Sequence, residues 1–294
     1  MKKHLILLSA LLLMMPLALA SCSSDDDNNS AALQPVTLTS PEHKDDAVKM
    51  NFTEETIVEN KIIKSIELTE SGKYLVTYSL AGAKTRSSET PLYLMGEYVK
   101  NGASITLSGF GTIEVNGEQG PSAAVTIKVG DSEVNVPATL TKNQAEQPMD
   151  IYLCRTWTVE KTRLLIGAAS VQQDFNGCNI YEVVEFVKSK GMAISDKFSS
   201  QKVVRGVTFT SANTFLVNYA DNSYDVGTWS WNGGVPTAEL QAGDITYSWN
   251  GEDMGNSLMK SNSQASVAFT AAECRLTLKA QLQDKDVEVV WYMR

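Results

Sequence analysis

The sequence predicts a mainly β protein, with two antiparallel β-meander or barrel domains in tandem and one short helix in the second domain. Three observations lead to this prediction. Many short segments alternate between apolar and polar residues, which is typical of strands with one buried face. Turn-forming residues separate these segments at short intervals. One hairpin-like pattern also occurs twice along the chain, as tandem copies of one fold would produce.

The repeated pattern occupies residues 65–78 and 206–219, at a constant offset of 141. Four identities carry it: Thr69, Leu75, Val76 and Tyr78 recur as Thr210, Leu216, Val217 and Tyr219. Each copy reads as an alternating strand, a turn and a second alternating strand. The turns hold Gly72 in the first copy and Asn213 in the second, and both residue types tolerate the positive φ of a tight hairpin. Each copy therefore predicts a β-hairpin.

A second match follows the first in the same order. GEYVKNG at 96–102 corresponds to GTWSWNG at 227–233. The offset falls from 141 to 131, so the loop before this match must be longer in the first copy. The polar segment 84–91 is the expected place of that loop. Two ordered matches favour a tandem duplication over chance similarity between turn-rich meanders.

The domains are expected at 36–145 and 149–294, because the polar stretch between them contains Pro148 and reads as a linker. The first domain ends in a predicted hairpin with a turn at Gly130, and both a closed barrel and a sandwich fit its pattern. The second ends in a predicted strand pair around the turn at 283–286.

One helix is predicted at 179–191, where four apolar residues recur at helical spacing. Asn179 is a suitable N-cap and Gly191 a suitable terminator. The four apolar residues are Ile180, Val183, Val184 and Val187.

Residues 1–21 have the pattern of a signal peptide, with Lys2 and Lys3 before an apolar run that is shorter than the ~20 residues of a spanning helix. The run ends in Leu-Ala-Ser followed by Cys22, which resembles the bacterial lipobox. The resemblance implies diacylglycerol on the Cys22 thiol, cleavage before it, and fatty acyl chains such as palmitate that anchor the protein to a membrane.

Residues 22–35 are expected to form a disordered tether behind the lipidated cysteine, because the Ser/Asp run has little apolar surface to bury. The acidic block 25–27 resembles the surface-export signal of Bacteroides-type lipoproteins. That resemblance implies an outer-membrane lipoprotein exposed at the cell surface, and the periplasmic face is the alternative.

The charge of the chain argues against nucleic acid as a partner. Residues 1–21 contain Lys2 and Lys3 and no acidic residue, so their removal takes the net charge from −9 to −11. Binding to a phosphate backbone requires a basic surface. The expected partners are the membrane, through the lipid anchor, and a ligand or an envelope protein.

The histidine and cysteine counts argue against an enzyme. After residue 21 the only histidine is His43, which excludes histidine-based zinc sites and Ser-His-Asp or Cys-His catalysis. No cofactor or metal is predicted. The Asp221/Asp225 and Asp284/Asp286 pairs lie in turn-like sequence, where aspartate is favoured for local hydrogen bonding. Three further cysteines fit either one disulfide with a free thiol or three buried thiols: Cys154, Cys178 and Cys274.

The segment 155–157 (Arg-Thr-Trp) near the start of the second domain, with the Gly-Thr-Trp-Ser-Trp strand at 227–231, resembles the small lipocalin-like domains of Bacteroides-type lipoproteins. The resemblance covers roughly 150–294 and, more faintly, 60–140. It implies a β-barrel. Such a barrel either holds a ligand or is filled by its own side chains.

Four aromatic residues are the candidate ligand-binding set: Trp229, Trp231, Tyr247 and Trp249. Within each predicted strand the two alternate, so they share a face and could form an aromatic wall for a small apolar ligand or a sugar. The alternative is that they are core residues. Two functions follow: a lipid-anchored envelope protein that binds a ligand in its C-terminal barrel, or a structural or assembly lipoprotein with filled barrels that acts through protein–protein contacts.

Overall fold

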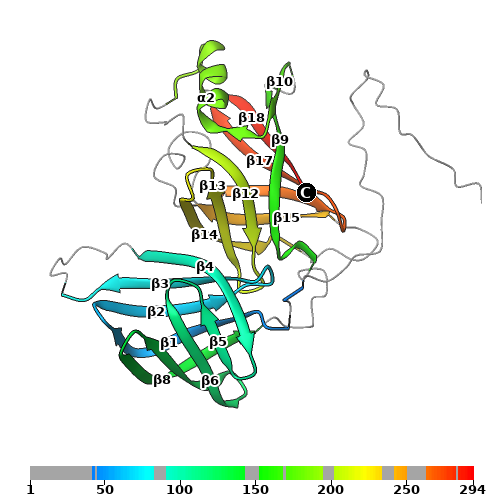
Figure 1. Ribbon diagram of the computed structural model, residues 1–294. Helices are drawn as coiled ribbons and strands as arrows, with labels where there is room; N and C mark the ends of the chain where they lie inside the picture. The colour runs from blue at the N-terminus through cyan, green and yellow to red at the C-terminus, as the bar shows by residue number, and fades with distance from the viewer. Residues whose placement is uncertain are drawn as a thin grey trace, which may run out of the picture. The chain divides into compact units, whose positions relative to one another are not determined.

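The computed structural model describes residues 42–43, 45–82, 91–142, 152–167, 170–194, 202–233, 242–249, 263–282 and 284–294. This part of the chain is mainly β and forms two closed antiparallel barrels, in agreement with the predicted fold class (Figure 1). The predicted signal peptide, Cys22, the tether and most of the predicted linker lie outside the described residues.

The first barrel contains eight strands in sequence order. The last strand closes the ring by pairing with the first, from Val48 opposite Lys142 to Phe52 opposite Ala138. Closure decides between the two predicted architectures in favour of a barrel. The strands are β1 (Val48–Val58), β2 (Lys61–Leu68), β3 (Lys73–Leu80), β4 (Leu92–Asn101), β5 (Ser104–Leu107), β6 (Gly111–Gln119), β7 (Ser122–Val129) and β8 (Ser132–Lys142).

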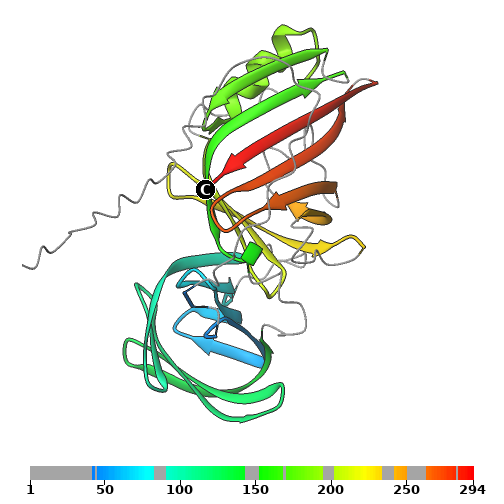
Figure 2. The same ribbon diagram turned by 90° about the vertical axis from the view of Figure 1, so that its right-hand side faces the viewer.

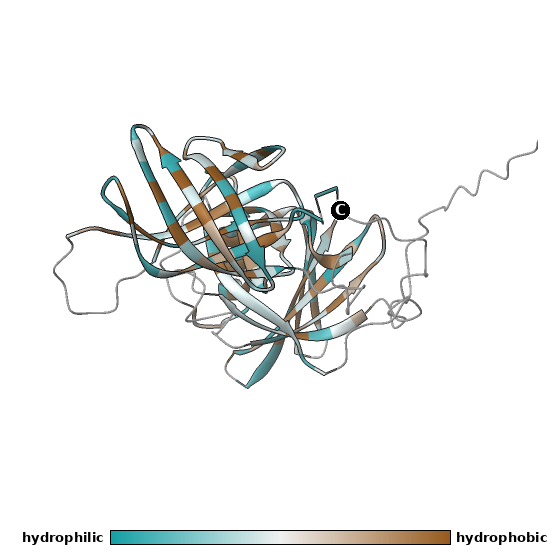
Figure 3. Cartoon of the chain, turned by 90° about the horizontal axis from the view of Figure 1, so that it is seen from below, coloured by the Kyte–Doolittle hydropathy of each residue, from teal (hydrophilic) through white to brown (hydrophobic). Residues whose placement is uncertain are grey.

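Alternation builds the core of this barrel. In β7, Ala123, Val125 and Ile127 are buried, and the residues between them are partly exposed. Apolar and polar positions alternate along the strands in Figure 3, as expected when successive side chains point to opposite faces. The predicted hairpin between β7 and β8 is confirmed, and Gly130 adopts φ +56° at its turn.

The second barrel also has eight strands, in the ring order β9-β18-β17-β16-β15-β14-β13-β12, closed by pairing between β12 and β9. Two further strands extend the sheet: β10 pairs with β9, and β11 pairs with β12. Figure 2 shows β9 beside the C-terminal strand β18. The strands are β9 (Thr156–Ile166), β10 (Val171–Asn176), β11 (Cys178–Asn179), β12 (Val203–Phe209), β13 (Thr214–Tyr219), β14 (Tyr224–Trp231), β15 (Ala242–Trp249), β16 (Ser263–Phe269), β17 (Cys274–Leu282) and β18 (Lys285–Met293).

The predicted helix is confirmed as α2 (Ile180–Ser189). The side chain of Asn179 accepts a hydrogen bond from the amide of Tyr181, and Gly191 adopts φ +79° just past the helix end. The four predicted apolar residues are all buried. They attach the helix to the core of the second barrel.

The predicted hairpin repeat is confirmed down to its register. In the first copy Ile66 pairs with Val76 and Leu68 with Tyr74; in the second copy the residues at the same offset pair in the same way. Each copy has an irregularity at the same place, between Ile63 and Ser65 and between 204 and 206. The turns also match, because Gly72 (φ +73°) and Asn213 (φ +63°) both adopt the left-handed conformation.

The second match also holds. Gly96 pairs with Tyr74 in the first barrel, and Gly227 pairs with Phe215 in the second. These residues occupy the same position relative to the repeated hairpin. The preceding loop is longer in the first copy, as predicted, because β3 ends at Leu80 and β4 begins at Leu92, whereas β13 and β14 follow each other closely.

Candidate functional site

The candidate aromatic residues lie on β14 and β15, which are neighbouring strands. Trp229 and Tyr247 stand directly opposite each other in the antiparallel pair. Trp229 is 3% exposed, and its indole Nε1 donates a hydrogen bond of 3.0 Å to the carbonyl of Thr210. Its ring meets the ring of Phe209 edge-on, with the centroids 5.5 Å apart. Trp229 is therefore held by the barrel itself.

The other members of the set differ in their surroundings. Tyr247 is 1% exposed and lies against Phe215, with ring centroids 5.8 Å apart. Trp231 is half-buried at the end of β14 and meets Trp229 edge-on at 5.5 Å. The backbone of Trp249 pairs with Gly227, and its side chain lies outside the described residues.

Burial to this degree favours a core role for Trp229 and Tyr247. A cavity large enough for a ligand would leave accessible area on the side chains that line it, and these two retain almost none. Ligand binding by the four aromatic residues stays a prediction. Among the members of the set whose side chains are described, Trp231 is the one that is partly exposed.

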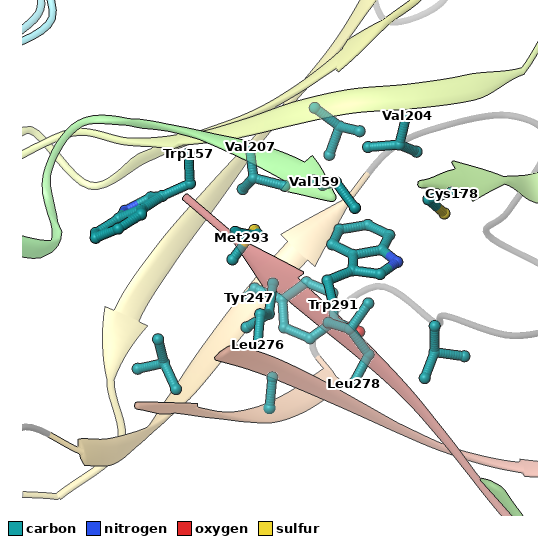
Figure 4. Packing of buried hydrophobic residues seen from close by; sticks show 14 of the residues in the cluster. Trp157, Val159, Cys178, Val204, Val207, Tyr247, Leu276, Leu278, Trp291 and Met293 are labelled. Carbon is teal, nitrogen blue, oxygen red and sulfur yellow. The ribbon is translucent and has the colours of Figure 1, made fainter. Parts of the chain in front are cut away.

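Trp157 lies where the β9 strand begins, and it is also a core residue. Its indole donates to the carbonyl of Leu153 at 2.9 Å. The guanidinium carbon of Arg155 lies 3.9 Å from the ring centroid, and this guanidinium also donates to the carbonyls of Thr270 and Ala271. Figure 4 shows Trp157 and the fully buried Trp291 among the aliphatic side chains of the same core.

The three cysteines of the second domain form no disulfide and are buried, which resolves the alternatives left open by their odd number. Burial raises the pKa of Cys178 to about 11 and raises the pKa of Cys274 as well. Reactivity requires the thiolate form. These thiols are therefore packing residues.

His43 and the aspartates considered as catalytic candidates make local contacts in the part of the chain that the structure describes. His43 packs edge-on against Tyr98, with ring centroids 5.4 Å apart. Asp221 and Asp225 accept hydrogen bonds from Ser223 and Tyr219. Within the described ranges, no group of three or more His, Cys, Asp or Glu residues is placed to hold a metal ion. The helices found there are too short or too polar to cross a bilayer.

The structure also brings together a polar cluster that the sequence interpretation missed. Glu67 and Glu70, on the hairpin of the first barrel, receive the hairpin tip of the second barrel. The Glu67 carboxylate accepts hydrogen bonds from the hydroxyls of Thr210 and Thr214, the latter at 2.7 Å. Lys49 lies 3.4 Å from the same carboxylate. Glu67 is 1% exposed, and these partners supply it with two hydrogen bonds and a neighbouring positive charge.

Glu70 is as buried as Glu67, but its carboxylate has fewer hydrogen-bond partners. Its Oε1 accepts a hydrogen bond of 3.0 Å from the backbone amide of Ser211, while its Oε2 has no hydrogen-bond partner among the described residues. Loss of solvent raises the pKa of Glu70 to about 7, and the neighbouring charge of Glu67 adds to this effect. The carboxyl group therefore titrates near neutral pH.

The cluster lies between the two copies of the repeated hairpin. At the repeat offset, Glu67 corresponds to Thr208 and Glu70 to Ser211, so the first copy supplies carboxylates where the second has hydroxyl side chains. Glu70 contacts its counterpart Ser211, whereas Glu67 contacts Thr210 and Thr214, so carboxylates of one hairpin accept hydrogen bonds from donors of the other. A sequence signal existed: two acidic residues stand within a predicted hairpin whose second copy has none at the same places.

Comparison with known proteins adds little. No protein-family model matches the chain, and no curated protein matches it. A crystal structure of a DUF3598-family protein of unknown function from Nostoc punctiforme PCC 73102 is similar over 84% of this chain and 93% of its own, at 8% identity and a TM-score of 0.25. PCNA from Thermococcus kodakaraensis covers 84% and 90%, at 14% identity and a TM-score of 0.15. At these TM-scores neither structure carries a conclusion about this chain.

Proposed function

We propose that this protein is a non-enzymatic lipoprotein of the bacterial outer membrane, exposed at the cell surface, that acts through the outside of its barrels. The observation that carries the proposal is the burial of Trp229 and Tyr247 among other aromatic side chains. A barrel filled in this way offers its outer surface, and not its interior, to a partner. The lipobox-like sequence ending at Cys22 supports the anchor.

One strand is placed to receive a partner protein. Among the described strands, β10 lies at the end of the sheet order and pairs with β9 alone. An unpaired strand edge can add a strand from another chain. Ion pairs occupy β10 at Asp174, which lies 2.6 Å from Lys161 and 2.8 Å from Arg163. Charged side chains on an edge strand hinder its pairing with strands of unrelated chains, so that a partner with complementary charges is favoured.

The second candidate is the ligand-holding barrel. Trp231 favours it, because this ring is half-buried and stacks edge-on against Trp229 at the end of β14. A half-covered tryptophan at a strand end is able to take an apolar ligand or the face of a sugar.

The anchor is tested by expressing the full-length protein in a Gram-negative bacterium and separating membranes from soluble protein. We expect the wild type in the outer-membrane fraction, labelled by an alkyne analogue of palmitate, and C22S in the soluble fraction without label. S24A is the matched control and should behave as the wild type. Label retained in C22S would contradict lipidation at Cys22.

The choice between the outer surface and the barrel interior is tested by native mass spectrometry of the full-length protein released in mild detergent. If the barrel is filled by its own side chains, the measured mass should be that of the lipidated protein alone, without a bound small molecule. A bound mass that disappears in W229F would favour the ligand-holding barrel instead.

Protease treatment of intact cells tests exposure, since a surface protein is cleaved while a periplasmic protein is protected.

A further inference from the structure

The outer wall of the second barrel opens into a cleft where two strands separate. β9 pairs with β12 only between 156–158 and 206–208. Beyond that point β9 continues along β10, and the other end of β12 pairs with β11. A cleft of about 590 Å³ lies at this separation, within the usual size range of ligand sites.

The charges lining the cleft have one sign. Among the described residues that line it, the charged ones are Lys73, from the start of β3, and Arg205, from β12. No described carboxylate forms an ion pair with either side chain. This is notable in a chain of net charge −9.

The surroundings of the cleft keep this positive character. Lys202 lies over the ring of Tyr219, 4.2 Å from its centroid, and adds a third cation. The adjacent carboxylates already have donors: Asp225 accepts from the hydroxyl of Tyr219, and Asp221 accepts from Ser223. Lys202 also acts on Asp221, because the hydrogen bonds from Ser223 and the positive charge of Lys202 both lower the pKa of that carboxyl. Lys73 and Arg205 are therefore the two cations of the cleft that have no carboxylate partner among the described residues.

Part of the remaining lining is polar and suited to hydroxyl groups, while Met95, Val203 and Val204 make another part apolar. Asn222, Ser223 and Thr158 are exposed polar residues of the cleft wall. The amide nitrogen of Asn218 makes only long contacts, of 3.5 Å to the carbonyl of Gly206 and 3.4 Å to Thr208. Amide and hydroxyl groups beside two cations match a ligand that carries both hydroxyls and a negative charge.

We infer that this cleft binds a small organic anion that carries hydroxyl groups, of the class of the sugar acids and sugar phosphates. Lys73 and Arg205 hold its anionic group, and the polar side chains of the wall contact its hydroxyls. The inference goes beyond the proposed function, since it needs neither the lipid anchor nor a partner at β10.

The test is isothermal titration calorimetry, in which the full-length protein in mild detergent is titrated with glucuronate, glucose 6-phosphate or glucose. We expect at least one of the two anions to bind, and glucose to bind about tenfold more weakly because it lacks the charged group. The tighter of the two anions then identifies whether the site takes a carboxylate or a phosphate.

Two variants assign the binding to the cleft. K73Q and R205Q should each weaken anion binding by about tenfold, which is the loss expected for one charge-assisted hydrogen bond. K279Q is the matched control, because Lys279 is exposed on β17 away from the cleft. Circular dichroism of each variant verifies that it is folded.

Three outcomes would overturn the inference. These are the absence of binding of either anion at millimolar concentrations, equal binding of glucose, and an equal loss of affinity in K279Q. None of them bears on membrane fractionation of C22S, so failure of the cleft and failure of the anchor are distinguishable.

Discussion

Glu70 shows how a single substitution between two copies of a hairpin changes the chemistry of a position. In the second copy the corresponding residue is Ser211, whose backbone amide donates to the Glu70 carboxylate. The side chain is 1% exposed, and Glu67 adds a second negative charge nearby. Burial of a carboxylate favours its protonated form. This residue therefore couples stability to pH.

The direction of the pH effect follows from the raised pKa. Glu70 has a pKa of about 7 in the folded protein and 4.5 in the reference state, so the folded state binds its proton more tightly. The stabilising contribution is complete below pH 4.5 and is lost as the pH rises through 7. Replacing Glu70 with glutamine removes the titration. Relative to the wild type, E70Q should therefore become more stable on going from pH 5 to pH 8, by up to about 3 kcal/mol.

Urea unfolding at a series of pH values measures this difference. The change in the free energy of unfolding with pH is the informative quantity. Burial of the glutamine amide in E70Q also changes the free energy of unfolding, but by the same amount at every pH. E55Q serves as the control, since Glu55 is exposed on β1. The same slope in the wild type and in E70Q would show that Glu70 does not titrate in this range.

At the scale of the elements, the hairpin turn is the conserved unit of the repeat. Both turns close with the same backbone bonds, from the amide of Gly72 to Thr69 and from the amide of Asn213 to Thr210. Each needs a residue in the left-handed conformation at its third position, and glycine and asparagine are the residues that adopt it at low cost. The turn therefore sets the register of both strands that follow.

A pair of glycine substitutions separates backbone strain from packing at this turn. Gly72 and Gly102 both have positive φ, of +73° and +63°. A Cβ on Gly72 would lie 3.0 Å from the imidazole of His43, whereas a Cβ on Gly102 would meet nothing within 4 Å. We expect G102A to lower the free energy of unfolding by about 1 kcal/mol and G72A by more. Equal losses in urea unfolding would show that His43 moves aside freely.

At the scale of the whole molecule, the described chain is stabilised by two packed cores and no disulfide among Cys154, Cys178 and Cys274. Large aromatic side chains fill much of the second core, with Trp157, Trp291 and Tyr247 among the largest fully buried residues. Burial of apolar area, and not a covalent link, supplies the stability of such a barrel. The barrels should withstand reducing agents.

Thiol titration checks this expectation. Ellman's reagent should find no rapidly reacting thiol in the native full-length protein and three after denaturation in guanidinium, provided that Cys22 is acylated. The midpoint of thermal unfolding should be the same with and without reductant. Fewer than three thiols in the denatured protein would indicate a disulfide.

The local patterns of the sequence determined the strands, the turns and the helix, because these depend on alternation, on helical spacing and on residues such as Gly72 and Asn179 that favour one backbone conformation. They also predicted both copies of the repeated hairpin and the places of their turns. In each case the information lies in a few neighbouring residues.

The tertiary structure alone decided what the strands enclose. Alternation places Trp229 and Tyr247 on one face of the sheet, but a core and a ligand wall share that pattern; the difference appeared only when Phe209 and Phe215 proved to cover the rings. The same holds for contacts between distant segments. Glu67 and Thr210 are far apart in the chain, and their hydrogen bond joins the two repeated hairpins, a contact that no local pattern of the sequence specifies.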